Sequence, residues 1–151
     1  RDGVRPSAPV ADPDLIDAYR DATGAATRGF ERTVGYVVQI EGDVARIHLD
    51  VVERHLNPYG AAHGGVVLTL LDTVGGVQVY LKARPARMAT INLATQFIDL
   101  VPPGPVVATA RIDRLGKSVA HTTCELHAES AAGPLLATAV ASYRLFGVGR
   151  T

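Results

Sequence analysis

Asp72 is the one charged residue in a long apolar stretch that covers residues 66–81. An ionised carboxylate in apolar surroundings is costly unless it is paired, hydrogen-bonded or kept protonated. Just upstream, the pair Gly64 and Gly65 is placed to open a helix, where free backbone N–H groups can hold a developing negative charge. A perturbed carboxylate near an anion-stabilising backbone can supply the chemistry of a hydrolytic site. The pattern therefore predicts hydrolytic chemistry centred on Asp72.

The spacing of these two features has a geometric consequence. Eight residues separate Gly64 from Asp72, and along a helix this is about 12 Å at roughly 1.5 Å per residue. A catalytic carboxylate acts within about 3 Å of the reacting atom or through one water, so one chain does not bring both groups to one centre. Two such helices packed antiparallel about a twofold axis would place Asp72 of one chain beside Gly64 of the other. We therefore expect a homodimer with two composite sites.

A possible metal-ligand triplet consists of Cys124 with His121 and His127. On a strand, however, residues 121 and 127 share one face while residue 124 points to the other. A single metal ion could not gather all three side chains. We therefore predict no metal site here and assign Cys124 to the core.

The segment Gly116-Lys117-Ser118 also has two interpretations. It lacks the upstream glycine of a phosphate-binding P-loop, so a Walker motif is excluded. It is then either a plain hairpin turn or a turn in which Lys117 and Ser118 contact the phosphates of a nucleotide-bearing substrate. The sequence does not decide between these two.

Hydrophobic periodicity predicts the elements that position these residues. Asp12-Pro13 is typical of a helix start, and period-two alternation on both sides of residues 41–43 indicates a hairpin. The stretch after Gly64 is apolar on almost every face, so we expect a helix that is buried all round. In chain order, the expected elements are a helix from residue 12 to about 24 or 29, strands 34–40 and 45–51, a helix over 64–82, and strands 87–99, 105–115, 118–129 and 134–146.

Short connections between the last four strands favour an antiparallel meander. One long helix wrapped by a single antiparallel sheet is an α+β arrangement, the layout of the hotdog fold.

The bulk composition is that of an ordinary globular chain. The 151 residues suit one domain, and the 15 Lys and Arg balance the 15 Asp and Glu, so no charge pattern for nucleic acid or an anionic membrane is present. The single cysteine and the lack of a secretory leader predict a cytoplasmic location. The longest apolar run falls short of the roughly 20 residues of a membrane span, so we expect no membrane segment.

The segment Asn57-Pro58-Tyr59-Gly60, followed by His63-Gly64-Gly65 and then by Asp72, resembles the hotdog-fold acyl-CoA thioesterases of the phenylacetate-pathway (PaaI-like) type. The similarity covers approximately residues 30–147 and includes Thr90 and the Gly116–Ser118 turn. This predicts a single hotdog domain over 30–147, preceded by a lead-in and helix over 1–29 and followed by a tail over 148–151.

The resemblance implies a role for each residue of the motif. Asp72 would act as general base on water or as nucleophile at the thioester carbon. The N–H of Gly64 would polarise the thioester carbonyl, Asn57 would position the water or that carbonyl, and Thr90 would help to orient the water. The predicted substrate contacts are His63, Gly65, Arg87, Lys117 and Ser118.

The resemblance also implies the reaction, which is hydrolysis of an acyl-CoA to a free acid and CoA without a metal or bound cofactor. It implies a homodimer across whose interface each site lies, and dimers that often pair into tetramers. Two rival functions are a non-catalytic acyl-CoA-binding hotdog protein and a hotdog hydratase or dehydratase. The latter usually needs a catalytic His beside the carboxylate, and His63 is the nearby candidate.

Some related enzymes carry a hydroxyl one turn after the carboxylate, where this chain has Gly76. Gly75 and Gly76 each cost the helix about 1 kcal/mol relative to Ala. We hypothesise that a second backbone or an acyl chain approaches closely at this pair.

Overall fold

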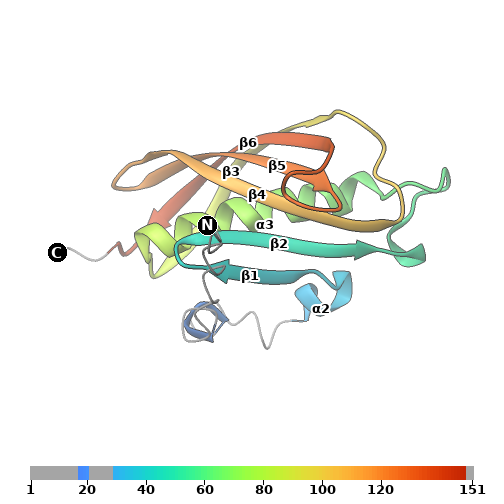
Figure 1. The fold of residues 1–151 in the computed structure, drawn as a ribbon. Helices are drawn as coiled ribbons and strands as arrows, with labels where there is room; N and C mark the ends of the chain where they lie inside the picture. Colours follow the sequence, from blue (N-terminus) through green and yellow to red (C-terminus); the bar gives the residue numbers. More distant parts are fainter. Residues whose placement is uncertain (1–16, 21–28, 149–151) are drawn as a thin grey trace, which may run out of the picture.

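The computed structural model describes residues 17–20 and 29–148. Its strands form a six-stranded sheet in the order β1-β2-β4-β5-β6-β3, with every neighbouring pair antiparallel. The elements are α2 (Phe30–Val34), β1 (Val37–Glu41), β2 (Val44–Val51), the short 3₁₀ helix η1 (Glu53–His55), α3 (Gly64–Ala83), β3 (Arg87–Phe97), β4 (Gly104–Leu115), β5 (Val119–Ala128) and β6 (Leu135–Phe146). Among the described residues there is one long helix, α3, and it lies along one face of this sheet (Figure 1), as expected for the hotdog fold.

The core lies between α3 and the inner face of the sheet. Alternate residues of β2 are buried, as are Ala120, Thr122, Cys124 and Leu126 on β5. They meet the buried side of α3, which includes Leu70, Leu71 and Val74. The period-two prediction for β2 and β5 is therefore confirmed, and so is the assignment of Cys124 to the core.

The pairing of the last four strands differs from the expected meander. Strands β4, β5 and β6 are consecutive neighbours, but β3 pairs with β6 at one edge of the sheet and β4 pairs with β2. Residues 98–103 connect the end of β3 to the start of β4 at the other side of the strand group (Figure 1). A longer connection of this kind permits the chain to leave an edge strand and re-enter at the centre of the sheet. Short turns and period two predict strands and faces but not this order.

Helix α3 is not buried all round, contrary to our expectation. Its buried residues lie on the side that faces the sheet. One side of the helix stays partly or fully exposed, and it comprises Gly65, Leu68, Thr69, Asp72, Thr73 and Gly76. These positions follow helical spacing, so a continuous stripe that contains Asp72 is uncovered in the single chain.

Helix α3 is also longer than the apolar run that we judged too short to span a membrane. At 20 residues, Gly64–Ala83 is long and apolar enough to cross a membrane by length and composition alone. The helix is longer than the apolar run because the flanking Gly64, Gly65, Lys82 and Ala83 also adopt helical conformation. Half of its most apolar window is buried inside the protein, and a helix packed under a sheet in this way is a core helix.

The first strand begins later than predicted. Phe30–Val34 form the short helix α2, whose C-cap Gly35 has a left-handed φ of 88°. Strand β1 therefore starts at Val37, and Val38 and Ile40 point into the core. Glycine adopts this φ without the cost that a side chain would add, so Gly35 allows the change from helix to strand.

The predicted N-terminal helix lies largely outside the described residues, within which residues 17–20 are helical. The proposed boundaries at residues 29–30 and 147–148 stay predictions.

Candidate active site

Asp72 lies on the uncovered stripe of α3, where edge strand β3 faces the helix. Its side chain is half-buried, and its Oδ1 accepts a hydrogen bond of 2.8 Å from the Thr90 hydroxyl. Its backbone carbonyl accepts a hydrogen bond of 2.9 Å from the hydroxyl of Tyr143 on β6. Asp72, predicted to be alone in an apolar helix, is therefore held by the sheet at one carboxylate oxygen and at its backbone carbonyl.

A cavity of about 230 Å³ opens beside this carboxylate. Asp72 and Thr90 form part of its wall, and the remaining wall residues are largely aromatic or apolar. These are Tyr19, Tyr36, Thr73, Gly76, Val77, Met88, Ala89 and Tyr143. A Cβ atom at Gly76, one turn after Asp72, would lie in ordinary contact with Tyr143 and Met88 of this wall, at 3.6 and 3.7 Å. The arrangement provides a carboxylate with one fixed oxygen at the edge of a partly apolar space.

The start of α3 presents a free backbone donor. The N–H of Gly65 donates to His63 Nδ1 over 2.9 Å, and His63 is the N-cap of the helix. The N–H groups of Val66 and Val67 both point to the carbonyl of His63. Among the described residues, the N–H of Gly64 has no acceptor. The helix N-terminus therefore leaves one donor available for an external anion or carbonyl oxygen.

This geometry separates the roles predicted for His63, Gly64 and Gly65. His63 acts in the structure as a cap, with Nδ1 occupied by the N–H of Gly65. Gly65 has committed its own N–H to that cap, so its N–H does not contact substrate while the cap is in place. Gly64 keeps the donor that an oxyanion needs.

Asn57 closes the loop that leads into α3. Its side-chain oxygen accepts from the N–H groups of Tyr59 and Ala61 at 2.9 and 3.2 Å, and its own N–H donates to the Ala61 carbonyl. Its side-chain NH₂ group is therefore the part that can still orient a water or a carbonyl. Asn57 therefore holds the loop in shape, whatever it contributes to a site.

The structure gathers the predicted residues into three groups rather than one. Asp72 and Thr90 form the first group, and Asn57, His63, Gly64 and Gly65 lie together at the start of α3. The two groups are separated by the eight residues between Gly64 and Asp72, which correspond to about 12 Å of helix.

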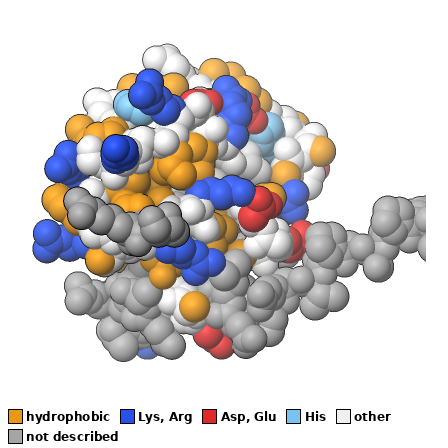
Figure 2. Space-filling model, turned by 90° about the vertical axis from the view of Figure 1, so that its left-hand side faces the viewer, with side chains coloured by type: hydrophobic (Ala, Val, Ile, Leu, Met, Phe, Trp, Pro, Cys, Tyr) orange, Lys and Arg blue, Asp and Glu red, His pale blue; other side chains and the backbone are white. Residues whose placement is uncertain are grey.

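The third group lies at the far end of the sheet. Arg87 is opposite Phe146 in the β3–β6 pair, and the Ser118 carbonyl accepts from the N–H of Leu145. Lys117 is exposed in the adjoining β4–β5 turn. The guanidinium carbons of Arg87 and Arg144 lie 4.8 and 5.5 Å from the centre of the Phe146 ring. Figure 2 faces this end of the molecule, where several Lys and Arg side chains lie at the surface.

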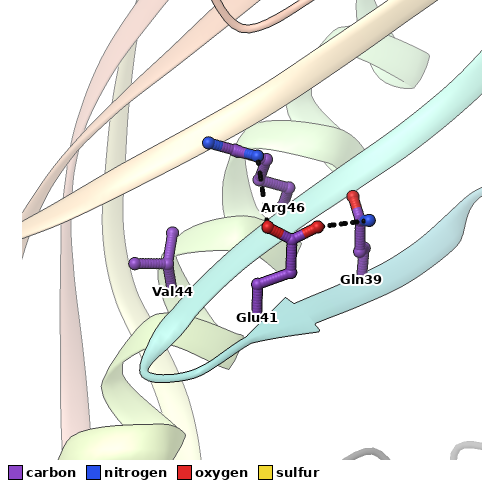
Figure 3. A pocket seen from close by; sticks show the side chains of 4 residues that line it. All are labelled: Gln39, Glu41, Val44 and Arg46. Carbon is purple, nitrogen blue, oxygen red and sulfur yellow. Dashed lines mark hydrogen bonds and ion pairs between the residues drawn. The ribbon is translucent and has the colours of Figure 1, made fainter. Parts of the chain in front are cut away.

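A separate cavity of about 260 Å³ lies on the β1–β2 hairpin, between Gln39, Glu41, Val44 and Arg46 (Figure 3). Its carboxylate is already engaged, because Glu41 accepts from Gln39 at 2.8 Å and pairs with Arg46 at 3.9 Å. It shares no residue with the cavity at Asp72. The opposite charges compensate each other, so we do not assign catalysis to it.

Gly75 contacts the sheet at close range. A Cβ atom at this position would overlap the Tyr143 hydroxyl and lie 3.0 Å from both Cys124 Sγ and Thr122 Oγ1. At Gly75 the close neighbours are therefore side chains of β5 and β6, and not the second backbone or acyl chain that we hypothesised. Burial raises the pKa of the Cys124 thiol to about 11, which argues against a nucleophilic role for this residue.

In the described part of the chain, no group of three or more His, Cys, Asp or Glu side chains is arranged to hold a metal ion. On β5, His121 is exposed while Cys124 is buried, as strand alternation predicted.

Sequence reasoning missed three residues that shape the site. Tyr143 contacts the main chain of Asp72, and Tyr36 lines the cavity with its pKa raised, chiefly by burial and against a hydrogen bond with Thr73. His55 is buried and joins the loop to α2, because its Nδ1 accepts from Val52 N–H and its Nε2 donates to the Val34 carbonyl. Of the three, Tyr143 could have been found from the sequence, because it is a tyrosine on the inner face of the predicted strand 134–146.

A six-stranded antiparallel sheet around one long helix, with a carboxylate on that helix, defines a hotdog-fold protein. The profile of the thioesterase superfamily matches residues 59–133, which include the loop, α3, β3, β4 and β5. Human acyl-coenzyme A thioesterase 13 is 27% identical over 128 residues, which cover 82% of this chain and 91% of the relative.

Solved structures agree with this assignment. A phenylacetic acid degradation-related protein from Ralstonia eutropha JMP134 is 27% identical, with a TM-score of 0.70 over 84% of this chain and 98% of the other. The PaaI protein of E. coli shares the fold at 18% identity, with a TM-score of 0.73 over 91% of this chain and 99% of the other. The chain belongs to the thioesterase superfamily and is a thioesterase of the PaaI-like type.

Proposed function

We propose that this thioesterase hydrolyses acyl-CoA to a free carboxylic acid and CoA, with Asp72 as the catalytic carboxylate. The observation that carries the proposal is the pair formed by Asp72 and Thr90 at the mouth of a cavity. Thr90 occupies Oδ1, so Oδ2 is the oxygen available to a water or to the thioester carbon. The name of the human relative supports an acyl-CoA as the substrate class.

Two routes use the same groups. As general base, Asp72 takes a proton from water while the water oxygen attacks the thioester carbon, and the carbonyl oxygen becomes an oxyanion. The C–S bond then breaks and the CoA thiolate leaves, taking up the proton. As nucleophile, a carboxylate oxygen attacks the carbon, CoA leaves, and water cleaves the resulting mixed anhydride. Water can attack either carbonyl of this anhydride. Label from ¹⁸O-water in the Asp72 carboxylate after a single turnover therefore identifies the second route, because general-base catalysis breaks no C–O bond of Asp72.

In both routes, we assign the oxyanion to the N–H of Gly64 in a second copy of the chain. The free donor at Gly64 and the helical separation of about 12 Å from Asp72 support this assignment. Edge strand β3 and the loop after it also expose apolar side chains, with Ile91 at 58%, Phe97 at 56% and Leu100 at 73%. A long edge strand with exposed apolar residues is normally covered by another element or chain. A homodimer that covers the β3 edge and the exposed stripe of α3 would bring Gly64 of one chain to Asp72 of the other and would also bury these apolar side chains. Such dimers could pair into tetramers.

The CoA carrier is assigned to the basic end of the sheet. Arg87 lies three residues before Thr90 on β3, a distance of roughly 10 Å along a strand. Arg87, Lys117 and Ser118 would contact the carrier's phosphates while the thioester lies at Asp72. In this interpretation, the Gly116–Ser118 turn is both a hairpin turn and a phosphate contact. A cytoplasmic location and the lack of a bound cofactor stay predictions.

The proposal is tested with a panel of aromatic, short, medium and long acyl-CoAs in a thiol-release assay. We expect hydrolysis of at least one class, and we expect Asp72→Asn to lose at least about a hundredfold in kcat with little change in substrate binding. Binding without turnover across the panel would favour the non-catalytic rival. Hydration of an enoyl-CoA without thiol release would favour the hydratase. Full activity of Asp72→Asn would exclude Asp72 as base or nucleophile.

A further inference from the structure

Two residues that are direct partners in the sheet both contact Asp72. Thr90 on β3 and Tyr143 on β6 lie opposite each other in the antiparallel register. Thr90 donates to the Asp72 carboxylate over 2.8 Å, and Tyr143 donates to the Asp72 backbone carbonyl over 2.9 Å. One cross-strand pair thus reaches both the side chain and the main chain of the same residue.

The Tyr143 contact is built into the core rather than added at the surface. Tyr143 is 2% exposed, and its hydroxyl occupies the space that a Cβ atom at Gly75 would need. Burial raises the pKa of Tyr143 further above its ordinary value, with smaller contributions from Cys124 and Asp72. The hydroxyl therefore stays protonated and serves as a donor throughout the range in which the enzyme would work.

We infer that Tyr143 is a positioning residue for the reaction and that it forms with Thr90 a two-point clamp on Asp72. This inference rests on the proposed catalytic role of Asp72. Tyr143 fixes the height of α3 above the sheet at the residue that carries the carboxylate, and Thr90 fixes the orientation of the carboxylate itself. Because Gly75 has no side chain, α3 can approach the sheet closely enough for the hydrogen bond from Tyr143 to the Asp72 carbonyl to form.

The clamp has a specific kinetic consequence. Tyr143 bonds to a main-chain atom of Asp72, so its loss would shift the carboxylate without removing any charge or closing the cavity. Small displacements of a catalytic group lower the rate of the chemical step far more than they lower substrate binding. The effect is therefore expected in kcat, with KM nearly unchanged.

The test compares Tyr143→Phe with the matched control Ser142→Ala. Ser142 is the preceding residue of β6, and its side chain is on the outer face of the sheet, away from α3. With the best substrate of the acyl-CoA panel, we expect Tyr143→Phe to lower kcat about tenfold and KM to change less than about threefold. Ser142→Ala should retain wild-type kcat. The double variant Thr90→Val/Tyr143→Phe should lose less than the product of the two single losses, because both residues act on one carboxylate.

The kinetics of Tyr143→Phe and of the double variant decide whether Tyr143 positions Asp72. Wild-type kcat in a folded Tyr143→Phe, or losses in the double variant that multiply, would overturn the clamp. If Tyr143→Phe fails to fold, NMR of the wild-type protein replaces it: a slowly exchanging Tyr143 hydroxyl proton coupled to the Asp72 carbonyl carbon supports the clamp, and a freely exchanging proton overturns it. Asp72→Asn is measured in parallel. If that variant is inactive while Tyr143→Phe is normal, the clamp fails alone; if it is active, the proposed function fails.

Discussion

The hydrogen bond from Thr90 to Asp72 can be removed with almost no change in shape. Valine has nearly the shape of threonine and suits a strand, so Thr90→Val deletes the hydroxyl and leaves β3 intact. The lost bond is a 2.8 Å contact between a hydroxyl and a carboxylate oxygen. Hydrogen bonds to charged groups contribute about 1.5–3 kcal/mol, and because Thr90 is exposed in the single chain, we take the lower end.

A loss of about 1.4 kcal/mol in the transition state corresponds to about tenfold in rate. We therefore expect Thr90→Val to lower kcat about tenfold, with KM within about twofold of wild type. Thr90→Ser keeps the hydroxyl and should stay close to wild type. The assay is thiol release at saturating acyl-CoA, with the melting temperature of each variant as a check on folding. A Thr90→Val variant with wild-type kcat would show that this contact does not orient the carboxylate during the reaction.

Two further predictions concern the helix start and the single cysteine. Gly64→Pro removes the free N–H at the first helical position, which tolerates proline, and the preceding His63 already has a ψ of 140° that suits a residue before proline, so we expect a loss of about a hundredfold in kcat. Gly64→Ala keeps the N–H, places its Cβ 3.5 Å from the Phe97 ring and should stay active. Equal activity of both variants would argue against an oxyanion at Gly64. Burial raises the pKa of Cys124 to about 11, so roughly 0.1% of the thiol is ionised at pH 8, and this fraction falls further as the pH drops. A thiol reagent should therefore label the native protein far more slowly than the denatured protein. Rapid stoichiometric labelling of the native protein would contradict the buried placement of Cys124.

Much of the fold could be predicted from residue patterns because alternation and helical periodicity record which face of each element is buried. The alternation on β5, for example, separates the buried Cys124 from the exposed His121. The same patterns do not record which strand lies beside which. The pairing of β3 with β6 depends on the connection over 98–103, and no single-strand pattern contains that information.

The site was predictable where chemistry and spacing coincide and not where packing decides. Asp72 and Gly64 stand out because a charge in an apolar helix and a glycine pair before it each need a reason. Tyr143 does not stand out, because a tyrosine among alanines on a strand is an ordinary core residue until the helix is placed above it. The uncovered stripe of α3 was missed for a related reason: composition shows that a helix is apolar, but a face can be reserved for a second chain rather than for the chain's own core.

We propose above all that each site combines Asp72 of one chain with Gly64 of another. The most direct measurement mixes Asp72→Asn with Gly64→Pro, each inactive alone, under conditions in which subunit exchange is proven by mass labelling. If the site is composite, half of a randomly exchanged population is heterodimer and each heterodimer has one intact site of two, so the mixture should regain about a quarter of wild-type activity. If both groups act within one chain, every site in the mixture carries a lesion. No recovery of activity despite proven exchange would contradict the account.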